Sequence, residues 1–543
     1  MKVSKIFTVA AFALMASLSS CVTDDGNYSY LSPEDAGEIK FDTVGMPTEM
    51  RYVFSSLSLG QHIEYTPKVK YAHPENLDYK WLAFKTDYST YKPVQVGNAQ
   101  VYPEPKVIGT SLNLSWDVDL EPGTYKIYIE AVDRVTGMKA YFYPHSSNYT
   151  TMNGPASVSG LFMLVERDGQ TDIEAMGSSL MLVAGGDHSE PAFYSTSTGN
   201  SIPGKPLYIR CSSAGKNSKE SYIVATTEGV FRINHTGLTM MDKWDDLFYN
   251  TPATFAPQYS TLDTNTGCEM FINNGKLHVL YASKANDRKY SDVIAGDYEA
   301  YPYLMPASRS TWRPNPEAIN ADQVIYDKKN HCFRPYYPMA STVSHFKSTI
   351  ADAYADANHL PSDPVAILNG GGNTTWAILD KDGSRWLYQF CFYDVVDNGD
   401  LSYGGERAIQ NLDGCTDIKN AKYWASNTGG NAFFYATDNK VYSYSTSSGA
   451  TTSNSIYECE AGEVVTAIYL GGSAGGGWPT SKCVFWIATW NETTKNGRLI
   501  QYEMDINNGV PQDMFGPAFA GKGGAYITDG WGKIKSMTFS MAE

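Results

Sequence analysis

One motif near the C-terminus has the spacing of a hydrolase nucleophile. Residues 471–475 read Gly-Gly-Ser-Ala-Gly, which matches G-x-S-x-G, and they follow a strand-like run at 464–470. In serine hydrolases this serine sits on a strand-to-helix turn, and the N-terminus of the helix helps to stabilise an oxyanion. Here residues 476–479 read Gly-Gly-Trp-Pro and cannot begin a helix. We therefore expect a glycine-rich loop at this position rather than a catalytic serine.

Residue types that bind metals are present, but their spacing does not indicate a metal site. Residues 187–190 read Asp-His-Ser-Glu and His331 precedes Cys332, yet none of the nine histidines forms H-E-x-x-H or H-x-H. Asp394, Asp397 and Asp400 suit calcium chemically, but they lack the EF-hand spacing and its terminal glutamate. The sequence therefore predicts no metal, no cofactor and no catalytic residue.

Aromatic residues in loop-like contexts are stronger candidates for binding. Rings held on a rigid rim can stack on the apolar faces of sugars or grip peptide side chains at low entropic cost. The alternative is that these rings pack inside the fold. The candidate ligand-binding residues are Tyr298, Tyr301, Tyr303, Trp312, Tyr336, Tyr337, Trp478 and Trp531. Four other tryptophans fall in strand-like runs and are expected in the core, namely Trp376, Trp386, Trp486 and Trp490.

The N-terminus indicates an export signal that ends at a lipidated cysteine. Lys2 and Lys5 precede an apolar run at 6–18, and small residues then lead to Cys21. The run is too short to span a bilayer, which requires about 20 residues. We predict a signal peptide over 1–20 and a lipid on Cys21 as the sole membrane attachment. An ordinary cleaved signal with a chance cysteine is the alternative.

Composition excludes one class of partner and suggests an extracellular β protein. The chain has 42 basic and 58 acidic side chains, so 40 against 58 remain once the two signal lysines are removed. A body with a net charge near −18 repels phosphate backbones, which argues against nucleic acid as a partner. Seven cysteines follow Cys21 without a C-x-x-C motif, so we expect most of them to be small buried strand residues. Their pairing stays open.

The first folded part is predicted to be an Ig-like sandwich. Residues 21–45 are polar and acidic and are expected to be a flexible tether. Over 46–155, short runs such as 77–81 and 125–132 alternate apolar and polar residues at the period of a β-strand. About a hundred such residues with an inward Trp81 fit an Ig-like sandwich.

The remaining residues, 156–543, repeat a hairpin pattern in which two β-rich runs flank a tight turn. The turns are Asp168-Gly169, Glu228-Gly229, Asn274-Gly275, Lys329-Asn330, Asp382-Gly383, Asp438-Asn439, Asn496-Gly497 and Asp529-Gly530. From Gly229 to Gly497 the steps are 46, 55, 53, 56 and 58 residues, which favours a β-propeller of about seven blades. We expect the C-terminal strands to pair with residues 162–166 and close the ring. A short helix over 344–358 is the one predicted excursion from the β pattern.

Several motifs together resemble the PKD-like lipoprotein family. They are Cys21 with Asp-Asp-Gly-Asn-Tyr at 24–28, Leu-Asp-Tyr-Lys-Trp at 77–81, Gly-Thr-Tyr-Lys-Ile-Tyr at 123–128, and Gly-Leu-Phe-Met-Leu-Val-Glu at 160–166. One departure is that Leu161 and Phe162 stand where the family commonly has Gly-Trp. The resemblance implies a lipid-anchored protein on the outer face of the outer membrane, beside a Sus-type nutrient uptake complex and its lid lipoprotein. It implies no catalytic residues.

Together these features predict an all-β surface lipoprotein, not an enzyme, that binds an extracellular polymer as an accessory to a Sus-type transporter. A glycan is favoured over a peptide. Two alternatives stay open: a propeller-based polysaccharide lyase or glycoside hydrolase, and an architectural subunit that binds no ligand.

Overall fold

The computed structural model describes most of the chain from residue 37 onward. The described residues are 37–42, 51–53, 62–85, 94–96, 99–101, 104–117, 123–143, 150–153, 160–177, 188–212, 221–235, 238–263, 268–281, 288–306, 323–337, 339–346, 355–371, 374–392, 394–397, 400–403, 408–426, 429–447, 450–471, 483–512 and 525–540. The chain divides into two compact units, and nearly all of the second lies after residue 152.

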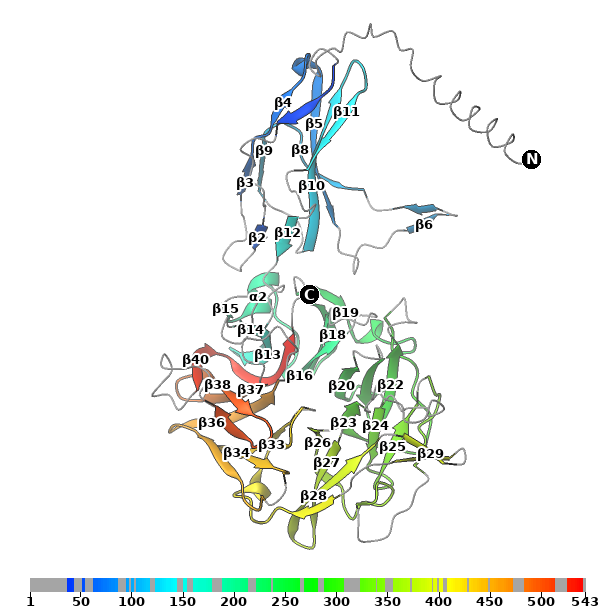
Figure 1. Ribbon diagram of the computed structural model, residues 1–543, viewed down its shortest axis with the longest axis vertical. Helices are drawn as coiled ribbons and strands as arrows, with labels where there is room; N and C mark the ends of the chain where they lie inside the picture. The colour runs from blue at the N-terminus through cyan, green and yellow to red at the C-terminus, as the bar shows by residue number, and fades with distance from the viewer. Residues whose placement is uncertain are drawn as a thin grey trace, which may run out of the picture. The chain divides into compact units, whose positions relative to one another are not determined.

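The first unit is a β-sandwich. Its main sheet has the order β2-β12-β10-β5-β8 with β11 paired to β10, and β1-β4, β3-β9 and β6-β7 form three further pairs (Figure 1). The strands are β1 (Lys40–Asp42), β2 (Arg51–Val53), β3 (His62–Tyr65), β4 (Lys68–Lys70), β5 (Leu77–Lys85), β6 (Val94–Val96), β7 (Ala99–Val101), β8 (Lys106–Gly109), β9 (Leu114–Asp117), β10 (Gly123–Asp133), β11 (Lys139–Phe142) and β12 (Thr150–Asn153).

Trp81 of β5 lies at the centre of this sandwich, as the sequence predicted. Its side chain is fully buried, Tyr65 packs edge-on against it at 5.6 Å between ring centroids, and its indole N–H donates to the carbonyl of Leu112 at 3.2 Å. The sandwich also begins earlier than expected. Phe41 of β1 pairs with Val69 of β4, so residues 40–42 belong to the fold and not to a tether.

The second unit consists of seven sheets arranged around a centre, which is a seven-bladed propeller (Figure 1). Blade 1 contains β41 (Lys533–Ser540), β13 (Gly160–Arg167), β14 (Gln170–Gly177) and β15 (His188–Glu190); blade 2 contains β16 (Pro206–Ser212), β17 (Ser221–Thr226), β18 (Val230–Asn234) and β19 (Met240–Asp242); blade 3 contains β20 (Pro257–Asp263), β21 (Cys268–Asn273) and β22 (Lys276–Tyr281); blade 4 contains β23 (Ala300–Pro306), β24 (Gln323–Asp327) and β25 (Cys332–Tyr336).

The chain continues around the ring through three more blades. Blade 5 contains β26 (Pro364–Gly370), β27 (Thr374–Lys381), β28 (Ser384–Cys391) and β31 (Ala408–Asn411); blade 6 contains β32 (Tyr423–Ala425), β33 (Ala432–Ala436), β34 (Lys440–Ser445) and β35 (Asn454–Glu458); blade 7 contains β36 (Glu463–Leu470), β37 (Cys483–Asn491), β38 (Asn496–Asp505), β39 (Val510–Gln512) and β40 (Tyr526–Trp531). A separate hairpin, β29 (Asp394–Asp397) and β30 (Asp400–Tyr403), lies between β28 and β31 in the sequence.

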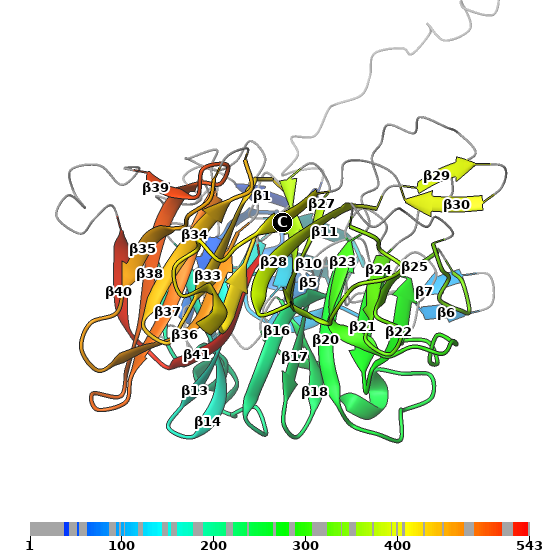
Figure 2. The same ribbon diagram turned by 90° about the horizontal axis from the view of Figure 1, so that it is seen from below.

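The ring closes by pairing the two ends of the propeller, as predicted. β41 pairs with β13, so that Phe162 lies opposite Thr538 and Met163 opposite Met537. The innermost strands contact one another in the order β41, β16, β20, β23, β26, β32 and β36, and β36 contacts β41 again. Figure 2 shows the neighbouring sheets of blades 2 and 3 side by side. No inner strand of the propeller is therefore left without a neighbour.

The predicted hairpin turns mark one equivalent position in six of the seven blades. Six of the eight turns join the second and third strands of their blade, as at Gly229 between β17 and β18. The other two turn predictions were wrong. The turn of blade 7 is formed by residues 492–495, because Asn491 pairs with Asn496. Asp529-Gly530 is not a hairpin turn, because β40 pairs with β38 and Gly530 lies at a register shift.

The predicted helix over 344–358 is not supported at its described ends. Residues 344–346 and 355–358 have no helical structure, and the centre lies outside the described residues. A short helix that the sequence did not indicate, α2 (Phe193–Thr198), follows β15 and buries Phe193 and Tyr194. None of the helices in the described part of the chain is long and apolar enough to cross a membrane.

The cores lie between neighbouring blades. Trp376 and Trp486 are fully buried there and Trp490 is nearly so, whereas Trp386 is only partly buried. Five cysteines with described side chains lie in or beside these strands: Cys211, Cys268, Cys332, Cys415 and Cys459.

Candidate functional site

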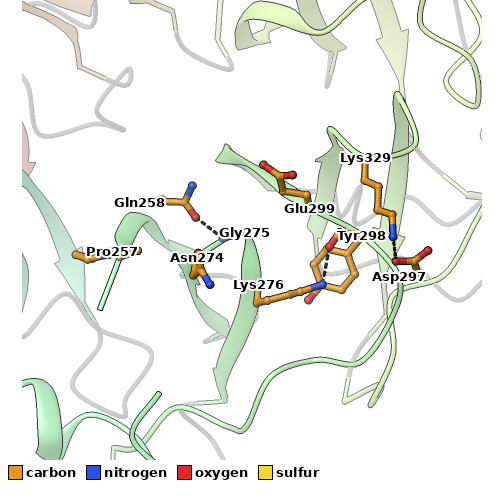
Figure 3. Close-up of a pocket in the computed structure, with 10 residues that line it drawn as sticks. Pro257, Gln258, Asn274, Gly275, Lys276, Asp297, Tyr298, Glu299 and Lys329 are labelled. Carbon is orange, nitrogen blue, oxygen red and sulfur yellow. Dashed lines mark hydrogen bonds and ion pairs between the residues drawn. The ribbon is translucent and has the colours of Figure 1, made fainter. Parts of the chain in front are cut away.

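A polar pocket of about 580 Å³ lies between blades 3 and 4 (Figure 3). Two kinds of segment line it. They are the turns between the second and third strands of both blades, and the residues that lead into β20 and β23. We call the surface formed by these turns and strand entries the turn face. The pocket residues are Ala256, Pro257, Gln258, Asn274, Gly275, Lys276, Asp297, Tyr298, Glu299 and Lys329.

The turn at the floor of the pocket is fixed by backbone geometry and hydrogen bonds. Asn274 and Gly275 both have positive φ, 50° and 68°, the left-handed conformation that a two-residue hairpin turn requires. The Asn274 N–H donates to the carbonyl of Ala256 at 2.9 Å, and the Gly275 N–H donates to Oε1 of Gln258 at 2.5 Å. The Ala300 N–H donates to the carbonyl of Gly275 at 2.9 Å, so this turn also ties blade 3 to blade 4.

The blade 4 side is held by a buried carboxylate. Asp327 is fully buried and accepts from the backbone N–H groups of Glu299, at 2.9 Å, and Lys329, at 3.0 Å. It also accepts from Asn330 at 2.7 Å and pairs with Arg334 at 3.2 Å. Because charge-assisted bonds of this kind are strong, Asp327 fixes both segments that form this wall.

The charged groups of the pocket balance. Lys329 pairs with Asp297, and the neighbouring Lys328 pairs with Glu299 at 3.1 Å. The hydrogen bond from Lys329 lowers the pKa of Asp297, so this carboxylate stays ionised. Lys276 donates to the carbonyl of Tyr298 at 2.6 Å and lies 4.4 Å above the centroid of its ring. Two lysines and two carboxylates therefore line the pocket, which leaves it without net charge.

Two amide side chains are available in this pocket. The Gln258 Oε1 is used by Gly275, but its Nε2 has no hydrogen bond among the residues that the structure describes. The side-chain amide of Asn274 is exposed and likewise has no partner among them. Together they offer uncharged donors and acceptors to a ligand.

A second pocket, of about 410 Å³, occupies the equivalent place between blades 7 and 1. Its lining residues are Glu166, Arg167, Asp168, Gly169, Trp490, Glu492, Lys495, Trp531, Gly532 and Lys533. Three acidic and three basic residues line it, so it is also balanced in charge. Glu492 is engaged by both Lys495 and the indole N–H of Trp490, and these hydrogen bonds lower its pKa.

The structure places several of the predicted aromatic residues inside the propeller. Tyr298, Tyr336 and Trp531 are at most 2% exposed, a position that favours the alternative that they pack between blades. Tyr298 lines the pocket but lies beneath Lys276, and its hydroxyl donates to the carbonyl of Ile294 at 2.7 Å. Burial raises the pKa of Tyr298 to about 12. Its ring is therefore part of the wall and has no free face for stacking.

The other predicted aromatic residues are partly buried or lie outside the described residues. Tyr301, Tyr303 and Tyr337 pack against the core between blades 4 and 5. Tyr301 donates to the carbonyl of Val365 at 3.2 Å, and Tyr303 donates to Asn369 at 2.6 Å. Trp312 and Trp478 lie outside the described residues.

The remaining motifs do not converge on a site in the described part of the chain. Ser473 of the G-x-S-x-G motif, Asp187 and Cys21 lie outside it. Nδ1 of His331 donates to Oδ1 of Asp363 at 2.9 Å, and Asp397 lies opposite Asp400 in the β29–β30 hairpin. No group of three metal-ligating side chains occurs among the described residues.

Sequence reasoning singled out the turns at Asn274-Gly275 and Lys329-Asn330, but only as markers of the repeat. Charged residues beside these turns could have pointed to the pocket. Lys276 follows the Asn274-Gly275 turn, Lys329 is the first residue of the next turn, and Asp297 lies between the two in the sequence. Gln258 carried no signal of its own.

Comparison with known proteins finds a family match in the N-terminal part of the chain. Residues 21–206 match the model of the PKD-like family, which confirms the expected resemblance over the sandwich and most of blade 1. No curated protein matches the chain.

Two solved structures illustrate how distant the similar chains are. The WD40 domain of SCAP from fission yeast is 10% identical, with a TM-score of 0.35, over 60% of this chain and 74% of that one. Hsv2 from Kluyvelomyces marxianus is 8% identical, with a TM-score of 0.28, over 62% of this chain and 99% of that one. These scores are too low to support any statement about function, and the blade order rests on the strand pairing given above.

Proposed function

With residues 21–206 matching the PKD-like family, we propose that the chain is a cell-surface lipoprotein of the outer membrane that binds an extracellular polymer. A lipid on Cys21 anchors it, and a Sus-type transporter with its lid lipoprotein receives the polymer. A glycan is the favoured ligand, and the pocket between blades 3 and 4 is the proposed contact.

The observation that supports a glycan is the chemistry of the pocket. It has no net charge, its carboxylates are held by lysines, and the amides of Gln258 and Asn274 are free to bond among the described residues. Neutral hydroxyl groups, which both donate and accept, match such amides well. A phosphate or a metal ion would require a surplus of one charge. The pocket is therefore suited to sugar hydroxyls.

The same carboxylates make hydrolysis the weaker alternative. A glycosidase needs one carboxylic acid whose pKa is raised, so that it can protonate the leaving oxygen. Here the pKa of Asp297 is lowered by Lys329, and Glu299 pairs with Lys328. These features support binding without cleavage.

Retention on polysaccharides tests the ligand. The mature chain is run through native gels that contain one neutral polysaccharide each, beside a Gln258→Ala/Asn274→Ala double variant. We expect at least one polysaccharide to retard the wild type and to retard the double variant several-fold less. Release of short oligosaccharides would favour the enzyme, and co-purification with a transporter without any retention would favour an architectural subunit.

The anchor has its own test. Mass spectrometry of membrane-extracted protein should find acyl chains on Cys21, and Cys21→Ser should release the protein from membranes. An unmodified Cys21 on the mature protein would contradict the proposed location.

A further inference from the structure

A chain of side-chain contacts crosses the inner strands at the axis of the propeller. The Arg210 guanidinium, from β16, donates from Nη1 to Ser536 of β41 at 3.0 Å and lies 5.1 Å from the ring centroid of Tyr259 on β20. The Tyr259 ring lies 6.0 Å from the ring of Tyr303 on β23, whose hydroxyl donates to Asn369 of β26 at 2.6 Å. Five consecutive blades thus contribute to one cluster, which we call the axial cluster.

The axial cluster is in contact with solvent. Arg210, Tyr259, Tyr303 and Asn369 are all partly exposed, although their strands are the innermost of the propeller. Tyr469 of β36 lies near this cluster from blade 7, and its hydroxyl accepts from the Phe539 N–H at 3.4 Å. Partly exposed side chains therefore converge on the cluster from several blades.

Arg210 differs from the other arginines of the propeller. In the part that the structure describes, Arg167, Arg232, Arg288, Arg334, Arg385 and Arg498 each pair with a carboxylate. Arg210 pairs with none of the described carboxylates. Its Nη1 donates to the carbonyl of Ile209 at 2.7 Å and to Ser536, and its Nε and Nη2 donate to no described residue.

The free edge of Arg210 has a specific geometry. Nε and Nη2 are the two parallel donors with which a guanidinium grips a carboxylate in the bidentate mode. Neither atom is among the buried polar atoms without a partner, so both are in contact with solvent. The rings of Tyr208 and Tyr259 hold the guanidinium plane at 5.8 and 5.1 Å, which presets the orientation of that edge.

The surroundings of this edge are neutral hydrogen-bonding groups. The Tyr259 hydroxyl has no hydrogen bond among the described residues, and Asn369 uses only its Oδ1 for Tyr303. The inner strands around the cluster carry few carboxylates. One is Glu463, which pairs with Arg498 at 2.9 Å, and another is Asp263, the last residue of β20. One unpaired cation among hydroxyl and amide groups matches a ligand with one carboxylate and several hydroxyls.

We propose that the axial cluster is a second binding site, for the carboxylate of a uronic acid residue, with Arg210 as its anion-binding side chain. The proposal does not rest on the proposed function, because the axial cluster and the turn-face pocket share no residue. The ligand class also differs, since the pocket is suited to neutral sugars and the axis to acidic ones.

The test is calorimetric titration of the mature chain with galacturonate and with a galacturonate trimer, against galactose as the neutral match. We expect an acidic sugar to bind and galactose not to bind at the axis. Arg210→Met should lower the affinity for the acidic sugar at least tenfold. Arg210→Lys should give an intermediate loss, because it keeps the charge but not the parallel donors.

Lys329→Met is the matched control, since it removes the same charge from the turn-face pocket. It should change uronate affinity less than twofold. If Arg210→Met does not fold, mass spectrometry of the phenylglyoxal-treated wild type replaces it, and galacturonate should then protect Arg210 from modification. Absence of uronate binding to the wild type, or equal binding to the wild type and Arg210→Met, would overturn the proposal.

Discussion

Met163 of β13 and Met537 of β41 lie directly opposite each other, although they come from the two ends of the propeller. Both side chains are buried in the core that blade 1 shares with blade 7. The pair is therefore the point at which the chain closes its ring. The turn-face pocket lies between two blades and the axial cluster joins five, so the geometry of both depends on how the blades are held in the closed ring.

Shortening Met537 should destabilise the closed ring. Met537→Ala is expected to lower the free energy of unfolding by about 2–5 kcal/mol, the usual cost of truncating a large buried side chain. Urea denaturation measures it. Lys535→Ala, on the same strand but exposed, should change the free energy by less than about 0.5 kcal/mol. Equal effects of the two variants would show that β41 does not close the ring.

The buried Asp327–Arg334 pair should matter far more than an exposed pair. Asp327→Ala leaves a buried guanidinium without its carboxylate and is expected to cost about 3–5 kcal/mol. Asp438→Ala breaks the pair with Lys422, where both side chains are 57% exposed, and is expected to cost no more than about 1 kcal/mol. Thermal melting of the two variants compares them directly. Melting of Asp327→Ala at the wild-type temperature would show that Asp327 does not fix the blade 4 wall.

His235 should make stability depend on pH. It is buried against Phe162 and Tyr222, and burial lowers its pKa from 6.5 to about 4. The unfolded chain thus binds the proton more readily, so this contribution is complete above pH 6.5 and is lost as the pH falls from 6.5 towards 4.

Replacing His235 isolates that effect from the carboxylates. Between pH 7 and pH 4.5, the free energy of unfolding should fall in both proteins. The fall should be smaller in His235→Phe than in the wild type, by on the order of 2 kcal/mol. Burial raises the pKa of Asp172 and Glu174, so these two carboxyl groups favour the folded state as the pH falls, opposite to His235. Their contribution is the same in the wild type and in His235→Phe and cancels in the comparison. Parallel pH profiles for the two proteins would contradict the burial of His235.

Alanine substitutions at two glycine turns distinguish an effect on backbone strain from an effect on ligand binding. Gly275 and Gly169 have φ of 68° and 77°, so alanine at either should cost about 1 kcal/mol. A Cβ at Gly275 would lie 2.9 Å from Cγ of Glu299, whereas one at Gly169 would meet nothing within 4 Å. Gly275→Ala must therefore displace Glu299 and should melt at or below the temperature of Gly169→Ala, and only Gly275→Ala should weaken retention of a ligand bound between blades 3 and 4.

The sequence predicts the blade hairpins well because their turns obey local rules. Gly229, Gly275 and Gly383 each follow a polar residue between β-rich runs, and each marks the second-to-third strand turn of its blade. The rule fails in blade 7, where the residue that takes positive φ, 52°, is Lys495 and no glycine marks the turn. A local pattern cannot locate a turn that lacks the usual residue.

The candidate sites were less predictable, because they depend on which blades are neighbours. Tyr298 lies in a proline-rich stretch and has the appearance of a rim residue in the sequence, yet it is covered by Lys276 from the preceding blade. Arg210 looks like any strand arginine until the ring shows that no described carboxylate reaches it. Both facts arise from contacts between segments that are far apart in the sequence.

The most direct test of the central claim, that the turn face binds a neutral glycan, is the retention of paired pocket variants in polysaccharide gels. Lys276→Met/Gln258→Ala alters the pocket between blades 3 and 4, and Lys495→Met alters the equivalent pocket between blades 7 and 1. We predict that the wild type and Lys495→Met are retarded alike by the polysaccharide that binds, and that Lys276→Met/Gln258→Ala is retarded several-fold less. Equal retardation of all three, or none by any neutral polysaccharide, would contradict the claim.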